Sequence, residues 1–315
     1  MMIELINLTE IFIETHNTIY DKYKKSNATK RKKYKVQERY LSLLNFTSNS
    51  CYWTKFNIDP KTNKYKKDEI SGKYLNEIHN KLVDYKFYEI LYKKLIDIYL
   101  KITNYESLNT ISQDSMFARN ILGINCKRNP QYYNKPGLKI HSIVDLYKTP
   151  LSIELTESTD HDSHFIESGI KNSFVDKDIF YKHCHKFLAD SSYNTDLNTF
   201  NVTDKGLNVI FGRNKQHIKN GTIIEEASTD DKNDYKKRGT SENFFGSVER
   251  YPCIINIYEK TRESYKGLVL FVACTMLAKK INNIITEKNN IETKKEREEN
   301  ILKRKNDEII RKKEE

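Results

Sequence analysis

The sequence predicts an α/β fold, in which a mixed β-sheet is flanked by helices and preceded by a helical N-terminal region. Apolar side chains recur at three- and four-residue steps between residues 75 and 98, which is the periodicity of amphipathic helices. After about residue 106 the pattern changes to short runs of β-branched and apolar residues separated by turn residues. Three successive strand-like runs, a helical stretch and then alternating strands and helices indicate a mixed sheet.

The expected elements form three regions along the chain. Residues 1–105 are expected to be helical, residues 106–281 to form the mixed α/β domain, and residues 282–315 to form a charged helix or tail. Strands are predicted over residues 108–118, 138–147, 150–158, 186–193 and 207–213, and a helix over 162–174. The segment YKKRGTSENFFGSVERY, residues 235–251, has the pattern of a helix that Pro252 ends or kinks.

The charge of the chain favours a polyanionic partner such as nucleic acid. The 315 residues include 54 Lys and Arg against 43 Asp and Glu, a formal net charge of +11. A+T-rich coding, which enriches Lys, Asn, Ile and Tyr, is an alternative explanation for part of this excess. The basic run over residues 21–35, with Tyr23 and Tyr34 inside it, is either a solvated arm or a phosphate-contacting segment.

Several features indicate an intracellular protein without a membrane partner. The five cysteines are widely spaced and odd in number, which indicates a reducing compartment and neither a disulfide framework nor a zinc ribbon. The N-terminus lacks the basic region of a signal peptide. The longest apolar run, GLVLFVACTMLA at 267–278, is too short to span a bilayer and predicts a buried core helix. We expect the protein in the cytoplasm, nucleoid or nucleus.

Three carboxylates occupy positions suited to a metal site. Asp114 lies in a predicted strand, Asp190 at the end of another, and Glu242 on the predicted helix of residues 235–251. On that helix Tyr235, Arg238 and Glu242 share one face, because they are separated by three and four residues. The alternative is an ordinary surface pair between Arg238 and Glu242. Clustered carboxylate oxygens suit Mg²⁺ or Mn²⁺, and two such ions can support phosphodiester displacement.

The order and spacing of these residues resemble the insertion-sequence DDE transposases that carry a Tyr-x2-Arg-x3-Glu-x6-Lys signature. Tyr235, Arg238 and Glu242 match that signature in register, whereas Glu249 stands where Lys is expected and is followed by Arg250.

Further segments resemble the same family. GLKIHSIVDLYKTPLSIELTESTDHDS, residues 137–163, resembles its G-x-K-x-H strand pair followed by a His-Asp step, and ADSSYN its second-Asp motif. Residues 258–278 resemble its closing Tyr-Glu-Lys element and apolar helix. CYW at 51–53 and the helices of 71–100 faintly resemble its helix-turn-helix-like N-terminal region.

The resemblance implies a ribonuclease-H-like core and a set of site residues. Two Mg²⁺ or Mn²⁺ ions would be held by Asp114, Asp190 and Glu242, and DNA would be contacted by Tyr235, Arg238, Arg250, Lys139 and His141. The alternative for the last two is that they are polar residues on one sheet face. The implied reaction is metal-dependent cleavage of transposon-end DNA followed by strand transfer into target DNA, with double-stranded DNA and a second copy of the chain, in a homodimer, as partners.

Two alternatives to this function stay open. One is a domesticated, non-catalytic DNA-binding protein of the same fold. The presence of all three carboxylates argues against it, whereas Glu249 in place of the signature Lys keeps it open. The other is a stand-alone two-metal nuclease. The chain carries no Walker-type phosphate loop, so nucleoside triphosphate hydrolysis is not indicated.

Overall fold

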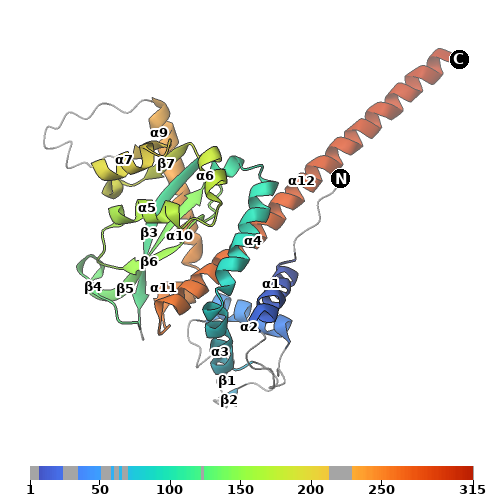
Figure 1. Cartoon of the computed structure of the whole chain (residues 1–315). Helices are drawn as coiled ribbons and strands as arrows, with labels where there is room; N and C mark the ends of the chain where they lie inside the picture. The colour runs from blue at the N-terminus through green and yellow to red at the C-terminus, as the bar shows by residue number, and fades with distance from the viewer. Residues whose placement is uncertain are drawn as a thin grey trace.

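The computed structural model describes residues 7–23, 35–50, 58–59, 64–65, 70–121, 124–212 and 229–314. Most of the basic run at 21–35 and the whole CYW segment lie outside these ranges. A curved sheet with its helices lies on one side of the molecule, and the N-terminal helices lie on the other, beside a very long C-terminal helix (Figure 1).

The N-terminal region is helical, as predicted. It consists of α1 (Leu8–Tyr23), α2 (Val36–Asn49), α3 (Gly72–Asp84) and α4 (Phe87–Ile102), with a short antiparallel pair, β1 (Ile58–Asp59) and β2 (Lys64–Tyr65), between α2 and α3. The apolar positions that predicted the amphipathic helices, such as Leu75, Leu82 and Leu95, are buried. These helices therefore form because their apolar faces pack into the core.

The mixed sheet has the order β6-β5-β3-β7-β8. Its strands are β3 (Thr110–Asn120), β5 (Lys135–Asp145), β6 (Glu154–Glu157), β7 (Lys186–Ala189) and β8 (Asn208–Phe211), and the short strands β4 (Arg128–Asn129) and β9 (Asn256–Ile257) pair with β5 and β3. Strands β3, β5 and β6 are antiparallel neighbours, whereas β7 and β8 run parallel to β3. The predicted ribonuclease-H-like mixed sheet is confirmed.

Helices cover both faces of this sheet because successive strand residues point to opposite sides. Gln113 donates a hydrogen bond of 3.0 Å to the Phe165 carbonyl, at the junction of η5 (Asp162–Phe165) and α5 (Ile166–Lys171). On the other face, Ser112 shares a 2.9 Å hydrogen bond with Thr240 of α10 (Gly239–Val248). The remaining helices near the sheet are η3 (Glu106–Asn109), η4 (Pro130–Tyr132), α6 (Lys177–His183), η6 (Ser191–Tyr193) and α7 (Asp196–Thr203).

The segment predicted as one helix over residues 235–251 is divided. It comprises the end of α9 (Thr229–Tyr235), the 3₁₀ turn η7 (Lys236–Arg238) and α10. Pro252 begins the next helix, α11 (Pro252–Ile255). At the first position of a helix the backbone N–H has no partner within the helix, so a proline loses no hydrogen bond there. The predicted helix is therefore present only in parts, and the predicted break at Pro252 is confirmed.

The first part of the last helix, α12 (Arg262–Glu314), lies in the core, and its C-terminal part projects from the molecule (Figure 1). Its residues Leu268–Cys274 are buried, so the predicted core helix is confirmed. By length and composition α12 could cross a membrane, but 67% of its apolar window is buried inside the protein. The C-terminal part extends away from the rest of the molecule (Figure 1), and the predicted division at 281/282 falls within this helix.

Buried polar contacts join the N-terminal helices to the sheet domain. Tyr99 of α4 donates a 2.5 Å hydrogen bond to Asp145 at the end of β5. His79 of α3 bonds both Tyr88 and the Ser264 carbonyl of α12, at 2.8 and 2.9 Å. Buried groups of this kind are costly to leave unpaired, so they fix how the two regions dock.

Candidate active site

The register of the parallel strands brings two carboxylates together. Gln113 of β3 pairs with Ala189 of β7, so Asp114 and Asp190 take the next positions on adjacent strands. Neighbouring strands lie about 4.8 Å apart. Asp190 is held in a tight turn, because its carboxylate accepts a 2.6 Å hydrogen bond from the Ser191 N–H.

A glycine on the third strand allows a tyrosine to approach this edge. Ala189 pairs with Phe211 of β8, so Gly212 lies next to Asp190. A Cβ at Gly212 would lie 2.4 Å from the Tyr235 hydroxyl and 3.2 Å from Asp190 Oδ1. The absence of a side chain at Gly212 is therefore what lets Tyr235 reach the second aspartate.

The 3₁₀ turn η7 and helix α10 deliver Arg238 and Glu242 to the same place. Arg238 forms an ion pair with Glu242 four residues later, and its Nη1 lies 3.7 Å from Asp114 Oδ2. Its guanidinium carbon also lies 5.7 Å from the centre of the Tyr235 ring. Phe244 and Phe245 are buried and anchor α10 against the core, as predicted. Arg238 therefore connects the helix carboxylate to the strand carboxylate.

The electrostatics of Asp114 reflect its burial and, to a lesser extent, its acidic neighbours. Burial, with additional repulsion from Glu242 and Asp190, raises the pKa of Asp114 to about 6, although the Ser115 N–H and Arg238 oppose the shift. Glu242 and Asp190 are thus close enough to act on Asp114. Of the three predicted carboxylates, Asp114 and Glu242 pair with Arg238, and Asp190 is close enough to influence Asp114.

The chemistry of this trio fits hard divalent cations, although Arg238 holds two of the three carboxylates. Carboxylate oxygens are the ligands that Mg²⁺ and Mn²⁺ prefer, and the repulsion felt by Asp114 is what a cation relieves. Within the described part of the chain, no three acidic, His or Cys side chains already converge as a ready metal site. Binding at these oxygens would therefore compete with the guanidinium of Arg238.

The remaining predicted DNA contacts differ in exposure. Arg250 and Glu249 are exposed just after α10. Lys139 and His141 of β5 are buried, with 6% and 2% of their surface exposed. Lys139 donates to Asp162 at 2.8 Å, and His141 bonds Thr156 at 2.9 Å. The contacts that the structure gives Lys139 and His141 are internal, and a contact with DNA stays a prediction for all the predicted residues.

Asp162 is a site residue that the sequence predictions missed. It accepts hydrogen bonds from Lys139 at 2.8 Å and from Ser115, the neighbour of Asp114, at 3.2 Å, and it lies 4.0 Å from His141 Nδ1. Burial lowers the pKa of His141 to about 4, so its imidazole is neutral near pH 7. The His-Asp step in TESTDHDS was the one sequence signal that pointed to Asp162. The residues that Asp162 contacts could not be predicted, because they depend on the register of the strands.

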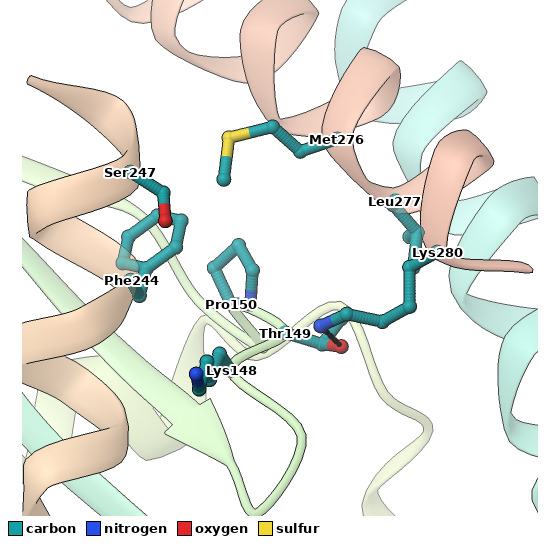
Figure 2. A pocket seen from close by; sticks show the side chains of 8 residues that line it. All are labelled: Lys148, Thr149, Pro150, Phe244, Ser247, Met276, Leu277 and Lys280. Atoms are coloured by element: carbon teal, nitrogen blue, oxygen red, sulfur yellow. Dashed lines mark hydrogen bonds between the residues drawn. The ribbon is translucent and has the colours of Figure 1, made fainter. Parts of the chain in front are cut away.

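A hollow lies between α10 and α12. Figure 2 shows Phe244 and Ser247 of α10 opposite Met276 of α12, with Lys280 reaching Thr149 at 2.8 Å. The cavity holds about 120 Å³, which is small beside the 300 Å³ or more typical of ligand pockets. Its lining is Lys148, Thr149, Pro150, Phe244, Ser247, Met276, Leu277 and Lys280, without a carboxylate. This hollow does not offer a cation site.

Comparison with known proteins agrees with the geometry. Residues 122–278 match the family model described as the transposase DDE domain. The chain carries a transposase DDE domain. Neither a curated protein nor a solved structure matches it. The matched segment of the transposase includes Asp190 and Glu242 and begins after Asp114. The predicted resemblance to insertion-sequence DDE transposases is thereby confirmed.

The raised pKa of Asp114 predicts a pH dependence of stability in metal-free buffer. The folded protein holds this proton more tightly than the unfolded chain, in which an Asp carboxyl has its ordinary pKa of 3.8. The free energy of unfolding should therefore fall as pH rises from about 4 to about 6, by up to about 3 kcal/mol, and then level off. Urea unfolding with a chelator present should show this fall, and Asp114→Asn should remove it. Parallel pH curves for the two proteins would contradict the assignment.

The Lys139–Asp162 ion pair predicts a loss of stability on Asp162→Asn. Lys139 has 8% of its side chain exposed, so removing its partner should cost about 2 to 3 kcal/mol of unfolding free energy. Glu14→Gln is the matched control, because the Glu14–Lys94 pair is exposed and should cost less than about 1 kcal/mol. Equal small losses in urea unfolding would show that Asp162 does not brace the site.

Proposed function

We propose that this protein is a transposase that cuts transposon-end DNA and joins the freed strand to target DNA. The observation that carries the proposal is the meeting of Asp114 and Asp190, on adjacent strands, with Glu242 on the facing helix. The DDE transposase family acts in transposition-related DNA cleavage and transfer, and most of the residues in question lie in the matched domain.

Each carboxylate has a role in this proposal. Asp114, Asp190 and Glu242 would hold two Mg²⁺ or Mn²⁺ ions, which supply an activated water or hydroxyl and stabilise the leaving oxygen when bound. Arg238 is adjacent to both Asp114 and Glu242, so it would turn from the carboxylates to the DNA phosphate as the ions bind. A guanidinium suits this role because it binds phosphate through two parallel hydrogen bonds.

The partners follow from the same site. Double-stranded DNA is the proposed substrate, and Tyr235, Arg238 and Arg250 are proposed phosphate contacts. The N-terminal helices, residues 1–105, are proposed to bind DNA, residues 106–281 to catalyse and residues 282–315 to form a charged tail. We also propose a homodimer in the DNA complex and an intracellular location where DNA is present.

One observation supports a second candidate. Glu249 is exposed at the place of the signature Lys, where a negative charge repels phosphate. A domesticated chain that binds DNA without cutting it would tolerate this change. Arg250 is also exposed there, and it offers the active transposase a replacement cation.

The proposed function predicts that Asp190→Asn and Glu242→Gln abolish cleavage. Because loss of groups that support metal ligands costs 10- to 100-fold, loss of a ligand should lower the rate by at least about 100-fold. The assay uses labelled duplex DNA from the flanks of the gene with Mg²⁺ or Mn²⁺, and follows both cutting and joining. DNA affinity should change little in the same variants.

The matched control is Asp204→Asn, an exposed carboxylate after α7, which should cut at the wild-type rate. Cleavage by Glu242→Gln at the wild-type rate would refute the site. DNA binding without any cleavage by the wild type would instead support the domesticated DNA-binding protein.

A further inference from the structure

A buried carboxylate lies directly before Tyr235 in the chain. Asp234, the last residue but one of α9, has 8% of its surface exposed. One of its carboxylate oxygens accepts a hydrogen bond from Lys186, and the other accepts one of 2.6 Å from Lys237. Each oxygen of Asp234 therefore binds one ammonium group, and the two groups come from different elements of the fold.

The first of these contacts ties α9 to the beginning of β7. Lys186 is the first residue of β7, and its side chain points to the same face of the sheet as that of Asp190, because side chains alternate along an extended chain. The four residues between them span about 13 Å. Asp234 is thus held at one end of β7. The hydroxyl of the next residue, Tyr235, reaches the other end, where it and Asp190 Oδ1 both approach Gly212.

The second contact ties the 3₁₀ turn η7 to α9. Lys237 lies in the middle of η7, three residues after Asp234, and the two side chains form an ion pair. Hydrogen bonds in a 3₁₀ helix have poorer geometry than those in an α-helix. Among the described residues, no side chain caps the start of η7 or of α10. Asp234 therefore supplies a side-chain contact that holds this turn.

The 3₁₀ geometry of the turn matters for the site. Side chains three residues apart lie above one another in a 3₁₀ helix, so Tyr235 and Arg238 project in the same direction. The guanidinium carbon of Arg238 lies 5.7 Å from the centre of the Tyr235 ring. An α-helical turn over the same residues would rotate the two side chains apart by about 60°. The turn η7 is therefore what lets both side chains face the carboxylates.

We propose that Asp234 is a positioning residue of the active site. By binding the two lysines it holds η7 in its 3₁₀ geometry, and η7 places Tyr235 and Arg238 beside the three carboxylates. This inference rests on the proposed function for the part that those carboxylates play in cleavage. The place of the Tyr235 ring does not depend on that function, so it can be tested without DNA or metal ions.

The test is the fluorine NMR spectrum of the full-length protein with 3-fluorotyrosine at position 235 alone, recorded in metal-free buffer. Because the chemical shift of fluorine reports the surroundings of the ring, Asp234→Asn should move the resonance towards its position in the urea-unfolded protein. Lys186→Met should move it in the same direction. The Lys186 side chain is 35% exposed, so this variant keeps the test decisive if Asp234→Asn fails to fold. Lys186→Arg keeps the cation and should leave the resonance unchanged.

The cleavage assay supplies a second readout. Misplacement of catalytic groups by about 1 Å can cost about 100-fold in rate. Asp234→Asn should therefore lower the cleavage rate at saturating duplex by at least about tenfold and change the affinity for DNA by less than about twofold. A merely structural role would instead reduce the folded fraction, and with it cleavage and DNA binding together. Asp204→Asn, the exposed carboxylate after α7, is the control and should match the wild type in both readouts.

An unchanged fluorine resonance in both Asp234→Asn and Lys186→Met would overturn the inference, whatever their cleavage rates. Wild-type cleavage by an Asp234→Asn variant whose resonance has moved would overturn it as well, because the placement of Tyr235 and Arg238 would then not matter to the site. A moved resonance together with no cleavage by the wild type would support the positioning of Tyr235 by Asp234 and would count against the transposase function alone.

Discussion

The proximity of three carboxylates, Asp114 within β3, Asp190 just after β7 and Glu242 on α10, is the constraint on which the site depends. Burial raises the pKa of Asp114 most, and repulsion from Glu242 and Asp190 adds to that rise. Arg238 offsets it by pairing with Asp114 and Glu242. Because Arg238 precedes Glu242 by one helical turn, the segment that delivers the third carboxylate also delivers its counterion. Arg238 thus offsets part of the negative charge of the site, and a bound cation would release the guanidinium.

The surrounding structure keeps these groups at the same sheet edge. Gly212 leaves room for Tyr235 beside Asp190, and the Ser112–Thr240 hydrogen bond holds the start of α10 over β3. On the opposite face, Asp162 joins Ser115 to buried Lys139. Hydrogen bonds therefore hold strand β3 on both of its faces, at Ser112 and Ser115, which flank Asp114. Such contacts limit the motion of the Asp114 carboxylate, which would have to bind a metal ion in one geometry.

The local sequence predicted most of the helices and strands, but it predicted much less of how they are placed relative to one another. Runs of β-branched and apolar residues identified β3 and β5, and a short apolar run identified β7. The spacing of Tyr235, Arg238 and Glu242 identified the helix carboxylate and its partner. The same spacing did not show that η7 interrupts the helix, since 3₁₀ and α turns differ little in sequence. Asp162 was missed because its contact with Lys139 depends on how η5 returns to the sheet.

Anomalous diffraction from crystals soaked in Mn²⁺ tests the central claim most directly, because it locates the cations without relying on activity. The account predicts Mn²⁺ at the oxygens of Asp114, Asp190 and Glu242, with the guanidinium of Arg238 turned away from Asp114. The Glu242→Gln variant should lose at least part of that signal. Crystals that show Arg238 still paired with Asp114 and Glu242, and no Mn²⁺ between the three carboxylates at saturating concentration, would contradict it.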